Sequence, residues 1–261
     1  MMSLLRKVLA HPLTRGMDID SPATTELRRR IVRCKPFLRR LYEEWYRLIR
    51  SQLPSISGNV LELGSGAGFM HEYIDGLITS EIFSTPGASV VIDGTKLPFA
   101  EGSLRAIVMT DVFHHIPAAR DFLAEARRCL KPGGAIVMIE PWFSAWSRFV
   151  YLRFHHEPFE PNATRWEFPA TGPLSGANAA LPWIVFHRDR EIFEREFPQL
   201  LVRRIRPMMP IAYLLSGGVS MRSLMPGFTY PFWRTLEKSL GVLADSAAMF
   251  ALIVVEVRKS Q

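Results

Sequence analysis

The stretch Val60-Leu61-Glu62-Leu63-Gly64-Ser65-Gly66-Ala67-Gly68 decides the fold of this 261-residue chain. An apolar run with one acid enters a turn that has glycine at every second position. This order is typical of a buried parallel strand that delivers its backbone to a ligand, because glycine removes Cβ atoms where the chain turns sharply. A dinucleotide fingerprint would have its third glycine at position 69, which is Phe69. The Gly-Lys-Ser/Thr ending of a phosphate-binding P-loop is also missing, so the turn disfavours pyrophosphate.

Strand and helix signals alternate after this turn and predict an α/β fold, a doubly wound, mostly parallel sheet with helical crossovers. The predicted strands are 59–63, 78–83, 89–92, 105–110, 135–140, 201–206 and 249–257. The predicted helices are 71–77, 118–130, 189–197 and 232–240. Residues 84–88 leave no room for a helix between the second and third strands, so we expect that edge of the sheet to be trimmed.

The net charge of +7 lies entirely in residues 1–50, which hold 12 Lys and Arg against 5 Asp and Glu. Ser21 and Pro22 predict a helix start, and Pro36 breaks or restarts the helix. The apolar stripe of the second helix consists of Phe37, Leu38, Leu41, Trp45, Leu48 and Ile49. We therefore predict a basic N-terminal helical arm, residues 1–52, packed on a domain of residues 53–261. The excess charge is either a solvated helix face or a contact with an anionic partner such as a membrane surface.

Cysteine content and hydropathy predict a cytoplasmic protein that is soluble or peripheral to a membrane. Cys34 and Cys129 are too few for a zinc site or a disulfide framework, and we expect no metal. Residues 1–9 do not resemble a secretory signal, because charges interrupt them and no small-residue cleavage site follows. The apolar run 247–255 is too short to span a bilayer.

Four segments in order resemble the class I S-adenosylmethionine-dependent methyltransferases. They are Leu61-Glu62-Leu63-Gly64-Ser65-Gly66-Ala67-Gly68, the segment from Asp93 to Leu104, Asp111-Val112-Phe113-His114-His115-Ile116, and Leu130-Lys131-Pro132-Gly133-Gly134. The resemblance covers residues 58–140 and, more loosely, the C-terminal strand. It implies a Rossmann-like fold, S-adenosylmethionine as cofactor and methyl transfer as activity.

The resemblance also implies which residues hold the cofactor. The glycine turn would pass under the methionine part, with Glu62 near its amino group. Glu81, 19 residues after Glu62, would hold the ribose hydroxyls, because one carboxylate accepts from two hydroxyls. Asp93 would accept from the adenine amino group. The full set of implied cofactor-binding residues is Glu62, Gly64, Ser65, Gly66, Gly68, Glu81, Asp93, Gly94, Thr95, Asp111 and Val112.

Methyl transfer from a sulfonium is an in-line displacement, so the enzyme mainly aligns the acceptor and excludes water. A general base is needed only where the acceptor holds its proton near neutral pH. His114 and His115 are the candidate catalytic residues, because histidine titrates in that range, and a capping or lining role is the alternative. Glu140 is expected to face the cleft. The 155–157 segment, His-His-Glu, is interpreted as a solvated or capping group.

Segments outside the resemblance are expected to select the acceptor. Residues 141–198 and 207–241 are rich in aromatic residues and methionine and are predicted to form a cap over the carboxyl ends of the strands, with 175–178 as a polar loop. An apolar, adaptable pocket under this cap favours a small, apolar or lipid-linked acceptor.

Two other functions stay open at this point. The basic arm would suit methylation of RNA or another nucleic acid, although the body is neutral and no Asn-Pro-Pro-Tyr motif for a flipped base is present. A non-catalytic, methyltransferase-like interaction module is the third possibility, against which the intact glycines, Glu81 and Asp93 argue. The sequence does not predict the oligomeric state.

Overall fold

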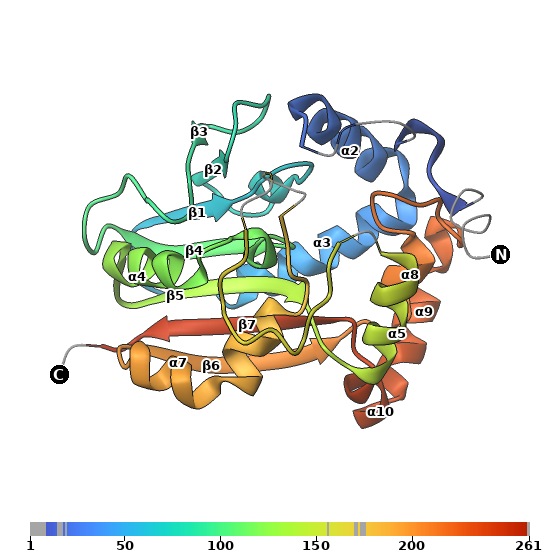
Figure 1. Ribbon diagram of the computed structural model, residues 1–261. Helices are drawn as coiled ribbons and strands as arrows, with labels where there is room; N and C mark the ends of the chain where they lie inside the picture. The colour runs from blue at the N-terminus through green and yellow to red at the C-terminus, as the bar shows by residue number, and fades with distance from the viewer. Residues whose placement is uncertain are drawn as a thin grey trace.

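The computed structural model describes residues 9–14, 18, 20–155, 157–169, 172 and 176–259. Its centre is a seven-stranded sheet in the order β3-β2-β1-β4-β5-β7-β6 (Figure 1). The strands are β1 (Asn59–Leu63), β2 (Leu77–Glu81), β3 (Val90–Val91), β4 (Leu104–Thr110), β5 (Leu130–Pro141), β6 (Leu200–Met208) and β7 (Phe250–Val257). β7 runs antiparallel to β5 and β6, and the other neighbouring strands of the sheet are parallel. The predicted fold class is therefore confirmed.

Helices cover both faces of the sheet (Figure 1). α3 (Pro36–Ser51) lies on one face, and α4 (Ala119–Cys129) and α7 (Arg190–Glu196) lie on the other. Further helices gather beyond the carboxyl ends of the parallel strands. They are α2 (Pro22–Cys34), α5 (Ala145–Phe154), α8 (Ala212–Ser216), α9 (Tyr230–Ser239) and α10 (Val242–Ser246). Short helical segments complete the chain: η1 (Pro12–Thr14), η2 (Met70–Glu72), η3 (Phe113–His115), α6 (Leu181–Trp183), η4 (Ile184–Arg188) and η5 (Gly227–Thr229). None of the described helices has the length and apolar character needed to cross a bilayer.

The two N-terminal helices begin where the sequence predicts. The Ser21 side chain accepts a hydrogen bond from Ala23 N at 3.3 Å, and Pro22 is the first residue of α2. The predicted stripe of α3 is buried against the sheet except for the half-buried Leu48, and its Trp45 ring lies 4.9 Å from that of Phe250 in β7. α3 is consequently part of the main core.

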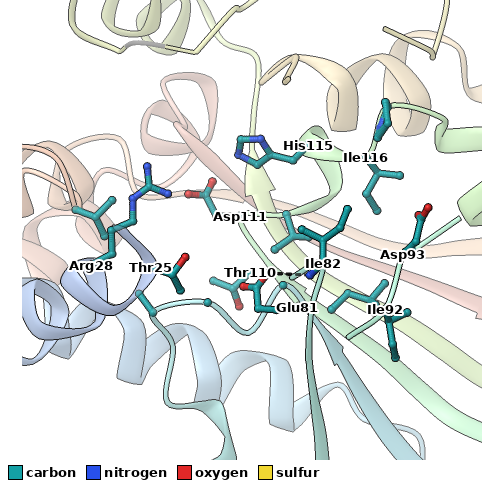
Figure 2. Close-up of a pocket in the computed structure, with 18 of the residues that line it drawn as sticks. Thr25, Arg28, Glu81, Ile82, Ile92, Asp93, Thr110, Asp111, His115 and Ile116 are labelled. Carbon is teal, nitrogen blue, oxygen red and sulfur yellow. Dashed lines mark hydrogen bonds between the residues drawn. The ribbon is translucent and has the colours of Figure 1, made fainter. Parts of the chain in front are cut away.

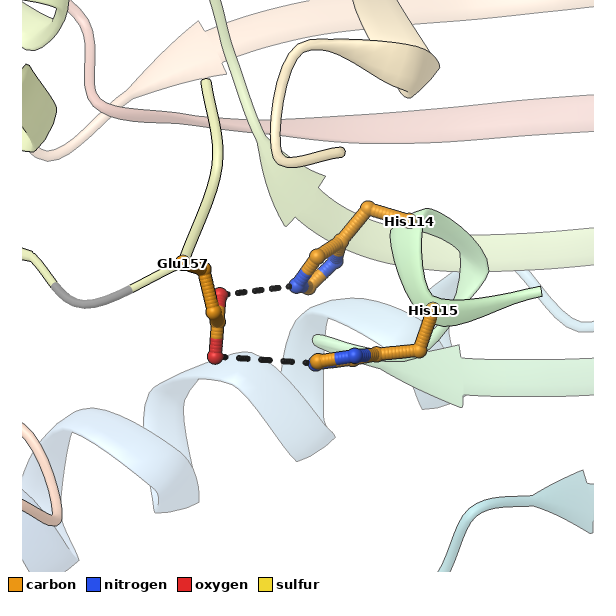
Figure 3. A group of neighbouring side chains, drawn as sticks. All are labelled: His114, His115 and Glu157. Carbon is orange, nitrogen blue, oxygen red and sulfur yellow. Dashed lines mark hydrogen bonds and ion pairs between the residues drawn. The ribbon is translucent and has the colours of Figure 1, made fainter. Parts of the chain in front are cut away.

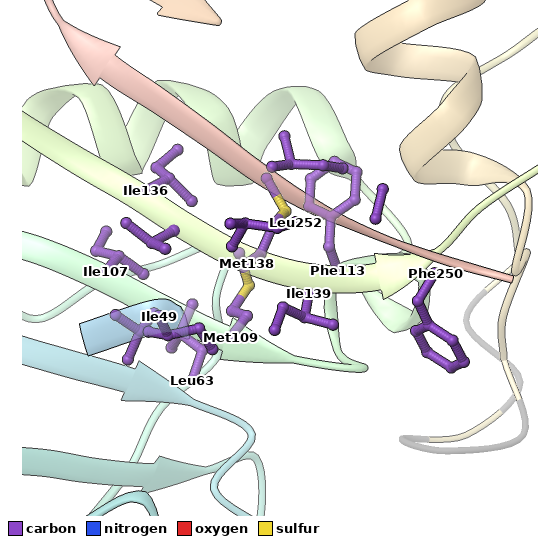
Figure 4. Close-up of a cluster of buried hydrophobic side chains, with 14 of the residues drawn as sticks. Ile49, Leu63, Ile107, Met109, Phe113, Ile136, Met138, Ile139, Phe250 and Leu252 are labelled. Carbon is purple, nitrogen blue, oxygen red and sulfur yellow. The ribbon is translucent and has the colours of Figure 1, made fainter. Parts of the chain in front are cut away.

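The core continues through the central strands (Figure 4). Every residue of β5 except Lys131 and Pro132 is buried, as expected for a strand covered on both faces. Leu63 and Met109 lie with Ile49 of α3 in this cluster. The apolar runs around positions 107 and 137 are therefore explained by burial on both faces.

Two predictions were wrong in detail. The helix predicted over 71–77 is only the single turn η2, because Gly76 takes a φ of +67° and β2 begins directly after it. The strand predicted over 135–140 was expected to follow a helix ending at residue 130, but β5 already begins at Leu130. The trimmed edge was predicted correctly, since the described residues 84–88 contain no helix.

Candidate functional site

A cavity of about 170 Å³ opens at the carboxyl ends of β1, β2 and β4 (Figure 2); we call it the first cavity. α2 contributes Thr25 and Arg28 to its wall, and α3 contributes Tyr42. Eight residues predicted for the site line it: Gly64, Gly66, Glu81, Asp93, Gly94, Asp111, Val112 and His115. The fold thus brings together segments that are 50 residues apart in the sequence.

The glycine turn after β1 is the floor of this cavity. Gly64 and Gly66 have φ angles of +64° and +42°, in the left-handed region that favours glycine. A Cβ atom on Gly64 would lie 2.5 Å from Val112 Cγ2, and one on Gly66 would lie 3.1 Å from Glu81 Oε1. Side chains at these two positions would therefore crowd the cavity wall.

Four of the predicted cofactor-binding residues lie outside the wall of the first cavity. Glu62, Ser65 and Gly68 line a separate cavity of about 190 Å³, and Gly66 lines both. Ser65 fixes the turn to β2, because its Oγ accepts from Ser80 N at 3.0 Å. Thr95 donates from its backbone N and its Oγ1 to Asp93 Oδ1 at 2.8 and 2.7 Å. These residues shape the site without lining the first cavity.

Buried carboxylates surround the turn. Burial raises the pKa of Glu62 to about 7, with the Ser65 hydroxyl opposing the shift and the charge of Glu81 adding to it. Burial also raises the pKa of Glu81, although the backbone N–H groups of Ile82 and Gly66 oppose this shift. Asp111 has a φ of +62°, and burial raises its pKa to about 7. Such carboxylates gain stability by accepting hydrogen bonds from ligand hydroxyl or ammonium groups.

A second cavity of about 130 Å³ adjoins the first. The two share a wall made by Arg28, Asp111, His115 and Val219. The other lining residues are mainly apolar or aromatic and come from α5, α8, the 217–221 turn and the residue before β7: Val150, Tyr151, Phe154, Tyr213, Leu214, Gly217, Gly218, Met221 and Met249, with Ser220, His155 and Glu157 as the polar members. Most of this wall therefore belongs to the segments 141–198 and 207–241.

The aromatic residues of the predicted cap divide between two roles. Tyr151 and Tyr213 line the second cavity, whereas Trp142 and Trp166 are buried in the core. In the predicted polar loop, Ser175 lies outside the described residues. Asn178 there accepts from Glu160 N at 3.0 Å and so fixes local backbone.

His114 is fully buried and lies between the carboxylates of Glu140 and Glu157, the second of which is drawn in Figure 3. Its Nδ1 is 2.8 Å from Glu140 Oε2, and its Nε2 is 3.3 Å from Glu157 Oε2. Burial opposes its charge, yet hydrogen bonds to Glu140 and Glu157 hold the pKa of His114 well above its ordinary value. His114 lines neither the first nor the second cavity.

Glu140 does not face the cleft, contrary to the prediction. It is completely buried beneath η3, where its Oε1 accepts from Val112 N and Phe113 N at 2.9 and 2.8 Å. Since its Oε2 is bonded to His114, both oxygens serve to hold the segment after β4. Glu140 is thus a positioning residue of the site.

His115 lines both cavities. Its Nδ1 donates to the Gly176 carbonyl at 3.1 Å, and its Nε2 lies 3.7 Å from Glu157 Oε1. Burial, together with the charge of His114, lowers the pKa of His115 to about 3. A general base works best with a pKa near the operating pH, so this value disfavours proton removal by His115.

Glu157 was interpreted as solvated or capping, and this was wrong. Its side chain is only 12% exposed and contacts both histidines. His156 lies outside the described residues. Glu157 is 43 residues from His114, so no local sequence pattern could have placed the two together.

Residues 61–138 match the family model described as a methyltransferase domain. These residues therefore form a methyltransferase domain, as the resemblance to the class I S-adenosylmethionine-dependent methyltransferases implies. The resemblance seen in the sequence is confirmed, and with it S-adenosylmethionine as the cofactor. A comparison with curated proteins found no match.

Several solved structures have a similar fold. A geranyl diphosphate C-methyltransferase from Streptomyces coelicolor A3(2) is 16% identical, with 97% of this chain and 92% of that chain covered and a TM-score of 0.47. A putative methyltransferase in complex with the Haloferax volcanii Trm112 activator is 16% identical, with coverages of 83% and 90% and a TM-score of 0.46. A putative methyltransferase from Bacillus halodurans C-125 is 13% identical, with coverages of 83% and 99% and a TM-score of 0.43.

The first cavity of the methyltransferase domain suits this cofactor. The turn at Gly64 and Gly66 leaves room that a Cβ atom would fill. Glu81 and Asp93 place carboxylates in the wall after β2 and β3, where ribose and adenine are expected. The glycine turn, Glu81 and Asp93 therefore fit S-adenosylmethionine, and their assignment to it stays a prediction.

Proposed function

We propose that this chain transfers the methyl group of S-adenosylmethionine to a small, apolar or lipid-linked acceptor bound in the second cavity. The observation that carries the proposal is the wall shared by the two cavities, formed by Arg28, Asp111, His115 and Val219. Bound S-adenosylmethionine supplies an electrophilic methyl group on a positively charged sulfur. An acceptor in the second cavity would meet it at this wall.

The walls of the second cavity support an apolar acceptor. Phe154, Leu214 and Met249 present apolar atoms to it, so an apolar group gains free energy by leaving water. Asp111 and His115 add polar atoms at the shared wall, where they can orient the reacting end of the acceptor. Positioning and exclusion of water are the main demands of methyl transfer.

Several basic side chains of the N-terminal arm donate hydrogen bonds to backbone carbonyls within the protein, which favours a small acceptor over nucleic acid. Arg29 Nη2 donates to the Gly66 carbonyl at 2.9 Å. Lys35 is buried, and its Nζ donates to the carbonyls of Gly218 and Met221, the latter at 2.7 Å. Binding of nucleic acid depends on exposed cations that meet phosphates, so these internal contacts reduce the phosphate-binding surface of the arm.

Other arginines of the arm stay exposed and fit an anionic membrane surface as a partner. They include Arg30, Arg33, Arg40 and Arg50, whereas the exposed Arg39 and Arg47 pair with Glu43. A membrane contact would bring the enzyme to a lipid-linked acceptor. We include this contact in the proposal, with a peripheral cytoplasmic location.

Filling the second cavity tests the proposed function. Leu214→Trp should leave the affinity for S-adenosylhomocysteine unchanged in calorimetry, because Leu214 lines only the second cavity. Transfer of a labelled methyl group from S-adenosylmethionine to a lipid extract should fall at least about tenfold. Leu224→Trp is the matched control, since Leu224 is 51% exposed and lies outside both walls. Wild-type transfer by Leu214→Trp, or no cofactor binding by the wild type, would refute the proposal.

A further inference from the structure

We propose that His114, His115 and Glu157 bind a divalent transition-metal ion, which holds an oxygen atom of the acceptor. The metal site itself rests on the geometry of the three side chains. Its role in holding the acceptor rests on the proposed function. One ligand atom from each residue lies within 4.8 Å of the other two (Figure 3). His115 and Glu157 line the second cavity, so the site borders the space assigned to the acceptor.

The separations between the ligand atoms fit one small ion. His114 Nε2 lies 3.3 Å from Glu157 Oε2, and His115 Nε2 lies 3.7 Å from Glu157 Oε1. Two ligand atoms bonded to a tetrahedral ion at about 2.0–2.1 Å are roughly 3.3–3.4 Å apart. Each histidine therefore lies close enough to Glu157 to share an ion with it, and all three ligand atoms lie within 4.8 Å of one another.

The other nitrogen of each histidine is already held as in metal sites of proteins. His114 Nδ1 donates to the Glu140 carboxylate at 2.8 Å, and His115 Nδ1 donates to the Gly176 carbonyl at 3.1 Å. Such outer hydrogen bonds fix the ring and the tautomer of a metal-binding histidine. Both Nε2 atoms are thereby directed toward Glu157.

A cation would lie between two groups that face each other as acceptors. With its proton on Nδ1, His115 turns an Nε2 lone pair toward Glu157 Oε1 at 3.7 Å, and both atoms accept hydrogen bonds. Glu157 Oε2 also lies 3.3 Å from His114 Nε2 and 3.5 Å from His155 Nδ1. A metal ion bound to His114, His115 and Glu157 would join the facing lone pairs and take the place of a proton on His114 Nε2.

The donor set indicates the kind of ion and its use. Two imidazoles and one carboxylate suit Zn²⁺, Fe²⁺, Co²⁺ or Mn²⁺ and leave at least one position open. His114 is fully buried, whereas His115 and Glu157 border the second cavity, so the open position faces that cavity. An acceptor with a hydroxyl or carbonyl oxygen could bind there and be polarised. The open metal position therefore restricts the expected acceptor to an apolar molecule that carries a hydroxyl or carbonyl oxygen.

The test uses the full chain, stripped with a chelator and titrated separately with Co²⁺ and Zn²⁺. We expect one ion per chain in calorimetry and the visible absorption of a low-coordinate Co²⁺ site. Glu157→Gln and His115→Gln should each weaken binding at least about 100-fold, because each removes a ligand. His71→Gln is the matched control, since His71 is an exposed histidine of η2 outside the cluster. Circular dichroism verifies that each variant is folded.

Each outcome tests either the metal site or its role in holding the acceptor. Folded wild type that binds neither ion, or binds them as tightly after both ligand substitutions, overturns the metal site. Acetohydroxamate, a small oxygen-donor probe, should alter the Co²⁺ spectrum. An unaltered spectrum would show that the ion does not hold an oxygen atom of the acceptor. Calorimetry with S-adenosylhomocysteine on the same preparations separates the two proposals. Loss of cofactor binding with intact metal binding would refute only the proposed function.

Discussion

Gly66 and Gly76 both have a left-handed backbone, but only Gly66 lies in a cavity wall. Their φ angles are +42° and +67°. A Cβ on Gly66 would lie 3.1 Å from Glu81 Oε1, whereas one on Gly76 would have no neighbour within 4 Å. Gly66→Val and Gly76→Val should both lower the free energy of unfolding by about 1–2 kcal/mol, because valine is strained at positive φ. Only Gly66→Val should lose binding of S-adenosylhomocysteine.

Calorimetry and thermal unfolding of Gly66→Val and Gly76→Val separate two effects, backbone strain at positive φ and crowding of the cofactor cavity by the new side chain. If Gly66→Val binds the cofactor as tightly as Gly76→Val does, the turn at Gly66 is not the floor of the cofactor site. Loss of binding in both variants would instead assign the effect to backbone strain.

The carboxyl group of Glu62 should make stability depend on pH. Its folded-state pKa is about 7, against an ordinary value of 4.5, because burial penalises the charged form. The folded state therefore binds the proton more tightly than the unfolded state. This contribution to stability is fully present below about pH 4.5 and is lost as the pH rises to about 7.

Glu62→Gln removes the titrating carboxyl group. Comparison with the wild type should therefore reveal how much deprotonation of Glu62 lowers the free energy of unfolding. At pH 8 the variant should be more stable than the wild type, by an amount on the order of 3 kcal/mol. At pH 4.5 the two should be nearly equal. Urea unfolding at both pH values measures the difference, and a difference that does not change with pH would show that Glu62 is not held in this environment.

At the scale of elements, the sequence predicts the bounds of strands better than it predicts the helices that follow them and pack over them. β1, β4 and β7 fall within one residue of their predicted bounds at each end, because continuous apolar runs between polar turns leave few alternatives. The predicted helix at 71–77 failed because a local pattern does not say where the chain must turn back into β2. Glu140 looked like a cleft residue by its position at the end of β5, but its role depends on η3, which packs over it.

The exposed arginines of α2 and α3 should carry any binding to anionic membranes. Reversing Arg30, Arg33, Arg40 and Arg50 to Glu should weaken binding to phosphatidylserine vesicles at low salt. Each basic residue near such a surface contributes about 1 kcal/mol, so the combined loss should exceed 100-fold. Vesicle sedimentation measures it, with binding expected to fall as salt rises.

The matched control reverses four exposed cations on the body of the protein, namely Lys96, Arg195, Arg204 and Arg206. It changes the net charge by the same amount but leaves the arm intact. Equal losses in the two variants would show that net charge alone drives binding, and no loss in the arm variant would remove the membrane from the proposal.

At the scale of the whole molecule, the site is assembled from parts that no local pattern connects. The shared wall takes Arg28 from α2, Asp111 and His115 from the segment after β4, and Val219 from the turn after α8. The glycine turn and its acids could be predicted because each follows a strand in a known order. The second cavity could not, since its lining depends on how α5 and α8 pack beyond the sheet.

The N-terminal arm should be required for folding of the whole chain. The α3 side chains buried to 1% exposure or less are Phe37, Leu38, Leu41, Trp45, Tyr46 and Ile49. Truncating one large core side chain typically costs about 2–5 kcal/mol, so losing all of them exceeds the roughly 5–15 kcal/mol that stabilises a domain. The 51–261 fragment should therefore lack cooperative thermal unfolding and cofactor binding. Deletion of residues 1–8 is the control and should preserve both. A 51–261 fragment that unfolds cooperatively and binds S-adenosylhomocysteine normally would show that α3 is dispensable for the core.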